Sequence, residues 1–148
     1  MTKDRLRIDF MVSIAIVRSE FNSEITDSMI KYARAHAKKL GLKVVAEATV
    51  PGAFEIPLLV KKMLERRDVD GVATIGAVIK GGTKHDELIA YQVASALMTL
   101  SLKYDKPVGL GVMGPGIDWE QAKKRRKQYA EQSVEAVLHV HKALKGDH

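Results

Sequence analysis

The chain carries, at residues 72–87, the stretch VATIGAVIKGGTKHDE, which decides its fold. The stretch opens as an apolar run, passes through the adjacent glycines Gly81 and Gly82, and then takes on a helical pattern. Glycines let the backbone approach a ligand closely, and the first N–H groups of a helix have no partner within the helix. The stretch therefore predicts a strand–loop–helix unit with a cradle for an anion such as phosphate, which the helix dipole also attracts.

The residues behind the glycines add a group that can transfer protons. Thr83 and Asp86 have the spacing of a capping box, which predicts a helix start near Lys84. His85 then lies in the first turn, and imidazole is the side chain that titrates near neutral pH. Two interpretations stay open on these residues alone: a phosphate site beside a proton-transfer group, as in an enzyme, or a tight turn with a surface histidine.

The rest of the chain alternates between strand and helix patterns. Short apolar, β-branched runs predict strands, and runs with apolar residues three and four apart predict helices. This order predicts a single α/β domain over residues 1–148, with a four-stranded parallel sheet between helices in three layers, α/β/α. The expected strands are 12–18, 43–50, 70–79 and 107–113, and the expected helices are 23–40, 54–66, 84–104 and 118–144.

Ligands of such sheets bind outside the carboxyl ends of the strands, where this chain places several unusual residues. Phe21 follows the first strand and either stacks on a flat ring or packs as a hydrophobic staple. Glu55 begins a helix and either accepts hydrogen bonds from hydroxyl groups or complements the helix dipole. Arg125 belongs to the basic run 123–127, which is either a solvated face or a source of bidentate phosphate binding.

Composition excludes several classes of function. The 148 residues include no cysteine, so the chain has no disulfide, thiolate nucleophile or zinc–thiolate site. It has no apolar run of about 18 residues and begins without the apolar core of a signal peptide, so we expect a cytoplasmic protein with no membrane contact. Despite a net charge of +6, aromatic residues are few and basic residues are mixed with acidic ones, which argues against nucleic-acid binding. No motif indicates a metal, a nucleoside triphosphate or a dinucleotide.

Four segments, taken in order, form a longer pattern: EFN at 20–22, VPGAFEIP at 50–57, GAVIKGGTKH at 76–85 and EQA at 120–122. Together they resemble the lumazine synthase family, whose members catalyse the penultimate step of riboflavin biosynthesis. The resemblance covers residues 13–143, and the sequence HDE at 85–87 and the basic last helix are similar to archaeal members.

The resemblance implies a flavodoxin-like fold and the condensation of 5-amino-6-(D-ribitylamino)uracil with 3,4-dihydroxy-2-butanone 4-phosphate. The products would be 6,7-dimethyl-8-ribityllumazine, phosphate and water, and neither a metal nor an organic cofactor would be needed. His85 would shuttle protons. The resemblance implies these binding roles: Phe21 for the pyrimidine ring, Asn22, Ala53, Phe54 and Glu55 for the ribityl chain, Val78 and Ile79 for the pyrimidinedione edge, and Gly82, Thr83 and Arg125 for the phosphate.

The chain departs from the family pattern near the fourth strand and in the last helix. Leu110 stands where members often carry an aromatic residue, so one wall of the expected pocket differs. The sequence Gly-Pro-Gly at 114–116 replaces a threonine-rich loop. A lysine common on the last helix corresponds to Gln132, with Lys127 as a candidate substitute. Glu135 is expected near His85, which it would orient.

The resemblance also implies a homo-oligomer with its active sites between subunits. Phe21 and Glu55 would come from one chain, and His85 and Arg125 from the next. Members form pentamers, decamers or shells of sixty chains, and the short polar N-terminus favours twelve pentamers over a free pentamer. Residues 1–12 are expected at a subunit interface, where a strand would extend a neighbour's sheet. Association with riboflavin synthase is left open.

Three other functions compete with this interpretation. The first is the archaeal type of riboflavin synthase, a relative with a similar fold that dismutates two lumazine molecules. Segments 53–55 and 82–85 favour lumazine synthase, because the motifs of that relative diverge there. The second is a non-catalytic flavin-binding shell protein, and the third is a basic nucleic-acid binder, whose binding would depend steeply on salt.

Overall fold

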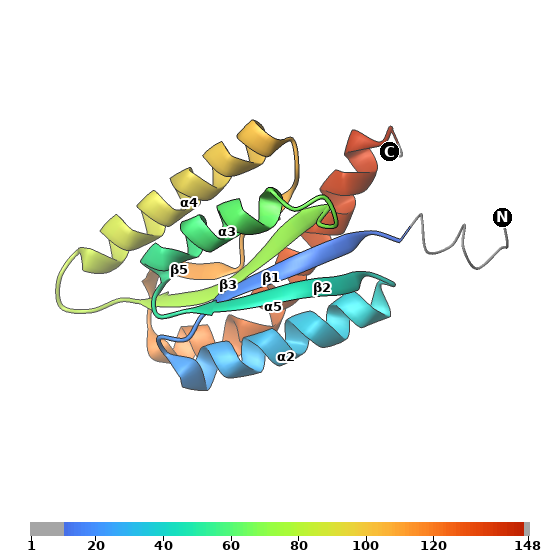
Figure 1. Cartoon of the computed structure of the whole chain (residues 1–148). Helices are drawn as coiled ribbons and strands as arrows, with labels where there is room; N and C mark the ends of the chain where they lie inside the picture. Colours follow the sequence, from blue (N-terminus) through green and yellow to red (C-terminus); the bar gives the residue numbers. More distant parts are fainter. Residues whose placement is uncertain (1–10, 147–148) are drawn as a thin grey trace, which may run out of the picture.

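A computed structural model describes residues 11–146 and shows a parallel sheet between two layers of helices (Figure 1). The elements in chain order are β1 (Ser13–Ser19), α2 (Ser23–Lys39), β2 (Lys43–Val50), the 3-10 turn η1 (Ala53–Glu55), α3 (Ile56–Leu64), β3 (Gly71–Ile79), α4 (His85–Tyr104), β4 (Val108–Gly109), β5 (Val112–Ile117) and α5 (Trp119–Leu144). Helices α3 and α4 cover one face of the sheet, and α2 and α5 cover the other. The predicted interface segment 1–12 lies outside the described residues except for its last two.

The sheet runs in the order β2, β1, β3, β4, with β5 also paired to β3, and all pairings are parallel. The expected α/β class and the parallel sheet flanked by helices are therefore confirmed. The single strand predicted over 107–113 is wrong. The chain instead forms β4, breaks at Leu110 and Gly111, and forms β5, so the described part of the sheet has five strands rather than four.

Strand β1 separates two hydrophobic cores. Successive side chains of a strand point to opposite faces of its sheet. Ile14 and Ile16 accordingly pack in the cluster under α2 and α5, whereas Ala15 and Val17 pack in the cluster under α3 and α4. All four are fully buried, which is typical of a parallel strand covered on both faces. This double burial fixes the end of the strand and therefore the start of the loop that follows it.

The break between β4 and β5 results from the close approach of α5 to the sheet. Ser133 on α5 accepts the N–H of Thr74 with an N–Oγ distance of 3.0 Å and donates its hydroxyl to the Thr74 carbonyl at 2.9 Å. The Thr74 hydroxyl donates to the Gly109 carbonyl at 2.6 Å and accepts the N–H of Gly111 at 3.1 Å. These buried bonds replace regular strand pairing, and Leu110 is left between them at the surface.

Gly109 should be essential to this packing. A Cβ atom at this position would collide with the backbone oxygen of Ser133, so we expect Gly109→Ala to lower the free energy of unfolding by about 2–3 kcal/mol. Urea denaturation at a fixed protein concentration measures the change. The control is Gly81→Ala, where a Cβ meets no atom within 4 Å and the effect should stay within about 0.5 kcal/mol. Equal losses in the two variants would contradict this account of the break.

Candidate active site

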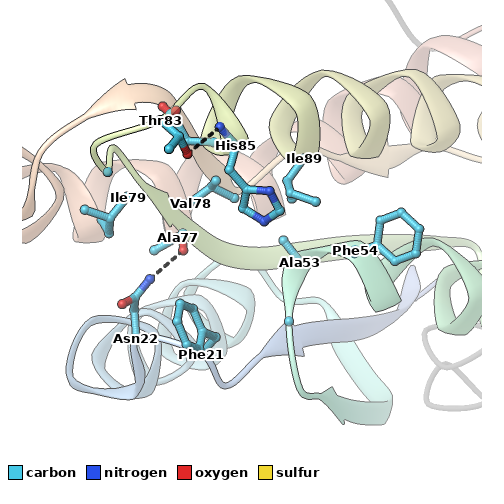
Figure 2. A pocket seen from close by; sticks show the side chains of 13 residues that line it. Phe21, Asn22, Ala53, Phe54, Ala77, Val78, Ile79, Thr83, His85 and Ile89 are labelled. Atoms are coloured by element: carbon cyan, nitrogen blue, oxygen red, sulfur yellow. Dashed lines mark hydrogen bonds between the residues drawn. The ribbon is translucent and has the colours of Figure 1, made fainter.

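A cavity of about 390 Å³ opens at the carboxyl ends of β1, β2 and β3, the edge where parallel α/β sheets bind ligands (Figure 2). Residues from three strand exits and from the first turns of α4 form its walls. The cavity therefore brings together residues that are far apart in the sequence. Its lining consists of Phe21, Asn22, Gly52, Ala53, Phe54, Ala77, Val78, Ile79, Gly81, Thr83, His85, Asp86 and Ile89.

The turn after β1 is tied to both neighbouring strands. The N–H of Phe21 donates to the Pro51 carbonyl at 2.9 Å, and the side-chain amide of Asn22 donates to the Ala77 carbonyl at 2.9 Å. Asn22 adopts the left-handed conformation, with φ of 63°, which asparagine tolerates better than most residues. The Phe21 side chain is 70% exposed, so it is not packed away as a staple would be, and its ring remains open to stacking.

The turn after β2 places a second aromatic ring at the cavity. Ala53 and Phe54 belong to η1 and line the cavity, and Phe54 is 66% exposed. Glu55 closes this turn, because its Oε1 atom accepts the N–H of Gly52 at 3.2 Å. In the single chain, Glu55 therefore stabilises the start of this helical segment instead of facing a ligand. Among the described residues, Glu55 does not belong to the cavity lining.

The loop between β3 and α4 forms the side of the cavity that carries His85. Gly81 and Gly82 are exposed, and a Cβ atom at either would meet no atom within 4 Å. Helix α4 begins at His85, as expected, and the N–H of His85 donates to the Thr83 hydroxyl at 3.4 Å. In Figure 2 the imidazole of His85 points from the start of α4 toward the side that carries Ala53.

The capping box predicted from Thr83 and Asp86 is not formed. Lys84 is the N-cap residue of α4 and its side chain accepts no N–H, while the Thr83 hydroxyl accepts the N–H of His85 rather than that of Asp86. The carboxylate of Asp86 turns instead toward the end of β5, where its Oδ2 atom accepts the N–H of Gly116 at 3.0 Å. The capping interpretation is therefore wrong, because a tertiary hydrogen bond takes the place of the local one.

Residues 11–145 match the family model described as 6,7-dimethyl-8-ribityllumazine synthase. The chain belongs to this lumazine synthase family. The matched range includes every helix and strand from β1 to α5 and every residue that lines the cavity. The family resemblance of the sequence is therefore confirmed over almost the whole chain.

Archaeal relatives in the lumazine synthase family share about half of their residues with this chain. A protein of Staphylothermus marinus is 54% identical over 127 residues, which cover 86% of this chain and 85% of the relative. A protein of Metallosphaera sedula is 48% identical over 137 residues, or 93% and 91% of the two chains. A protein of Methanocaldococcus jannaschii is 47% identical over 135 residues, or 91% and 95%. All three carry the name 6,7-dimethyl-8-ribityllumazine synthase.

Four residues that the resemblance to lumazine synthase assigns to the site do not line this cavity. Glu55 closes η1, and Gly82 lies on the exposed loop between two lining residues. Leu110 is 51% exposed at the break between β4 and β5, and Arg125 is exposed on α5. Among the described residues, no lysine or arginine belongs to the lining. The cradle predicted for a phosphate is thus left without a cation in the described part of a single chain.

The expected division of the lumazine synthase site between subunits is wrong in one respect. Phe21 and His85 were expected in different chains, yet both line the same cavity of one chain. The reason is topological: β1 and β3 are neighbours in the sheet, so the loops that follow them meet at one edge. The aromatic ring of Phe21 and the imidazole of His85 therefore line one cavity within a single chain.

Glu135 does not orient His85. Its Oε1 atom lies 2.7 Å from Nε2 of His36, and Oε2 of Glu131 lies 3.6 Å from Nδ1 of the same ring. His36 belongs to α2 and is only 9% exposed, so the carboxylates of α5 meet a buried histidine rather than His85. Glu131 and Glu135 lie four residues apart, on the same face of α5. This spacing is the sequence signal that both carboxylates contact one partner, which is His36.

Four lining residues were not predicted from the sequence: Gly52, Ala77, Asp86 and Ile89. Gly52 and Ala77 adjoin residues that were predicted, so their positions followed from the motifs. Ile89 lies four residues after His85 and therefore on the same face of α4. The place of Asp86 in the cavity lining could not be predicted, because its hydrogen-bond partner Gly116 lies thirty positions away in the chain.

The cavity is lined by a few polar side chains among mostly apolar ones. No group of three histidine, aspartate or glutamate side chains in residues 11–146 is arranged to hold a metal ion. No helix in the same range is both long enough and apolar enough to cross a bilayer. The polar side chains in the cavity lining are those of Asn22, Thr83, His85 and Asp86.

Proposed function

We propose that this chain condenses 5-amino-6-(D-ribitylamino)uracil with 3,4-dihydroxy-2-butanone 4-phosphate to form 6,7-dimethyl-8-ribityllumazine, phosphate and water. The observation that carries the proposal is the combination in one cavity of an exposed aromatic ring, a glycine loop at a helix start and an imidazole, in a member of the lumazine synthase family. Each feature suits one part of the two substrates: a flat ring, a phosphate and a carbonyl that must exchange protons.

The cavity offers a binding position for each part of the aminouracil along the carboxyl ends of the strands. Its pyrimidine ring stacks on Phe21, whose face is open, and its polar edge meets the backbone of Val78 and Ile79. The ribityl hydroxyls lie along η1 and the Asn22 side chain. The Asn22 amide nitrogen donates a hydrogen bond to the Ala77 carbonyl, which leaves the side-chain oxygen of Asn22 to accept a hydrogen bond from a ribityl hydroxyl.

The phosphate of the butanone lies at the loop that precedes α4. The 20-residue helix presents unpaired N–H groups and the positive end of its dipole there. Gly81 and Gly82 leave room for close approach, and Thr83 adds a hydroxyl. The helix start alone would attract many anions, so the specificity of this site must come from the reacting partner held beside it.

The reaction needs orientation more than it needs a strong catalyst. The amine of the uracil attacks the ketone and forms an imine with loss of one water. Phosphate is then eliminated, which leaves an enol that becomes a new carbonyl, and the ribityl-bearing nitrogen attacks this carbonyl and closes the ring with loss of a second water. Amines react readily with ketones, so holding both substrates in one cavity provides much of the rate. His85 moves protons between the nitrogen, the leaving oxygen and the carbonyl that closes the ring.

A second copy of the chain completes the site by supplying Arg125 and Leu110. Both are exposed in the single chain, and the cavity lining among residues 11–146 contains no permanent cation, although a dianionic phosphate calls for one. Pairing an arginine with a phosphate gives both charge and a bidentate geometry. The proposed site thus takes its cavity from one subunit and its phosphate arginine from the next.

Helix α4 supports self-association. Its inner face, with Ala90, Val93 and Leu97, is buried against the sheet, yet its outer face also carries large apolar side chains. A helix that is apolar on both faces belongs between two packed surfaces. The exposed outer stripe consists of Leu88, Tyr91, Met98 and Leu102.

We include in the proposal a ring of five chains closed by this stripe, and a shell of twelve such rings. Within the described residues the outer edge of β2 has no strand partner, which suits a strand from a neighbouring chain. Light scattering should report about sixty chains per particle, and a five-chain particle at every concentration would contradict the shell.

Because a charged sugar phosphate does not cross a bilayer unaided, we place the reaction in the cytoplasm.

Turnover by the wild-type protein tests the proposed function. The two substrates are mixed with the assembled protein, and lumazine absorbance and released phosphate are followed together. We expect both products to appear in equal amounts. Riboflavin formed from lumazine alone would assign the chain to riboflavin synthesis instead. Tight riboflavin binding without turnover would identify a flavin-binding shell, and either result would overturn the proposal.

His85→Ala should slow the reaction about tenfold without abolishing it, because positioning remains when proton transfer is lost. Steady-state kinetics should show the loss mainly in kcat, since the imidazole acts during the chemical steps. His139→Ala is the matched control, because His139 is an exposed histidine on α5 that does not line the cavity. An unchanged kcat in His85→Ala would remove His85 from the proposed mechanism.

A further inference from the structure

The loop between β3 and α4 is held at its two ends rather than along its length. Gly81 and Gly82 have no atom within 4 Å of a Cβ position, so side-chain packing does not fix the loop. At its first end, the N–H of Lys80 donates to the Ile117 carbonyl at 2.8 Å. At its second end, Asp86 accepts the N–H of Gly116 at 3.0 Å. Two successive residues of β5 therefore hold both ends of the loop.

Asp86 is unusual among the acidic residues of the chain. It is 6% exposed, and the described residues include no other buried carboxylate. A buried carboxylate is costly unless hydrogen bonds and nearby dipoles compensate for the lost water. The Gly116 N–H and the first turn of α4 supply both. Gly116 has φ of 74°, a conformation that glycine adopts without strain.

The position of Asp86 connects this contact to the cavity. Asp86 lines the cavity and directly follows His85, while Thr83 and Gly81 lie on the loop that its hydrogen bond closes. If Asp86 lost its partner, its carboxylate would be free to turn toward the loop, where it would repel a phosphate. The Gly116 N–H therefore both fixes the loop and directs the negative charge of Asp86 toward β5.

We infer that Asp86 is a positioning residue that holds residues 81–85 in the conformation that binds the phosphate of the butanone substrate. The inference rests on the proposed function for the identity of the ligand, but the loop conformation itself can be measured without turnover. It distinguishes the two substrates: the phosphate-bearing one depends on Asp86, whereas the aminouracil, on the Phe21 side of the cavity, does not.

The kinetic test compares three variants with wild type. Asp86→Ala removes the acceptor and should raise KM for the butanone phosphate about tenfold, while KM for the aminouracil changes less than about twofold. Asp86→Asn keeps an oxygen that can accept the Gly116 N–H and should remain within about threefold of wild type. Glu87→Ala removes an exposed carboxylate from the same helical turn and should match wild type. Thermal unfolding checks that all variants fold.

Amide hydrogen exchange of residues 80–88 provides a measurement that does not depend on catalysis. Asp86→Ala should exchange about tenfold faster there, and Asp86→Asn and Glu87→Ala should exchange like wild type. If Asp86→Ala does not fold, Asp86→Ser replaces it, because serine suits a first helical turn but is too short to reach Gly116.

The outcomes separate the inference from the proposed function. Wild-type protein that fails to turn over would reject the function, and the exchange data would still decide the role of Asp86. If Asp86→Ala showed wild-type amide exchange and a wild-type KM for the butanone phosphate, the inference would be overturned. Equal damage in Asp86→Asn and Asp86→Ala would also overturn it, because charge rather than the hydrogen bond would then be responsible. Equal rises in both KM values would show a general structural role instead.

Discussion

Replacing Arg125 with alanine is expected to lower kcat/KM for the butanone phosphate by about 10²–10³-fold, since an arginine–phosphate pair is both charged and bidentate and its loss leaves the phosphate charge unpaired. KM for the aminouracil should change little, because that substrate carries no phosphate. Steady-state kinetics with each substrate varied in turn separates the two effects. Arg125→Lys should recover part of the loss, since lysine restores the charge but not the bidentate geometry.

The control for Arg125 lies one residue away. Lys124 is also exposed in the basic run of α5, and Lys124→Ala removes the same charge from the same helix. We expect this variant to stay within about twofold of wild type at moderate ionic strength, because exposed charges are screened by salt. Equal losses in Lys124→Ala and Arg125→Ala would mean that the basic run acts through its general field, and the assignment of Arg125 to the phosphate would be wrong.

Thr83→Glu is expected to reduce kcat/KM at least about hundredfold. It places a carboxylate on the loop that receives the phosphate, and two like charges at short distance repel strongly where water is excluded. Thr83 is exposed, so the substitution should leave the fold intact, which thermal unfolding can verify. The same kinetic assay measures the loss, which should again fall on the phosphate-bearing substrate.

Thr83→Gln separates charge from bulk in this experiment. Glutamine has nearly the same size and shape as glutamate but carries no charge, so we expect a loss of only about tenfold or less. If the glutamine and glutamate variants were equally impaired, steric crowding would explain both, and the loop between β3 and α4 would lose its role in phosphate binding.

The layers of the fold and most of the cavity were predictable because they depend on local patterns. Short apolar runs located β1, β2 and β3, and helices α2, α4 and α5 begin and end within one residue of the expected positions. Parallel strands bring their carboxyl ends to one edge, so the motifs that carry Phe21, Ala53 and His85 had to meet there. Periodicity and topology were sufficient for this part.

The features that the sequence did not predict all depend on contacts between distant residues. The break between β4 and β5 requires Ser133 on α5 to reach Thr74 on β3. Asp86 looked like part of a capping box because Thr83 has the right spacing, and only the folded chain brings Gly116 to it. The contact between His36 on α2 and Glu135 on α5 joins residues 99 positions apart, and nothing in the pattern of α2 indicates it.

The proposed reaction requires the proposed oligomer, because the cavity of a single chain suits only part of the chemistry. It offers a ring surface, backbone groups and an imidazole, but its lining in the described chain holds no lysine or arginine. Arg125 is exposed on α5, away from the cavity lining. We therefore propose that a complete lumazine synthase site takes its cavity from one chain and Arg125 from a neighbour.

Subunit mixing tests this claim most directly. Thr83→Glu chains and Arg125→Ala chains, each nearly inactive alone, are unfolded and reassembled together in equal amounts, and lumazine formation is measured. If each site uses two chains, random mixing pairs an intact cavity with an intact arginine in about one quarter of the sites, so activity should return to roughly a quarter of wild type. Activity that stays at the mean of the two separate variants would mean that one chain supplies both parts, which would contradict the account.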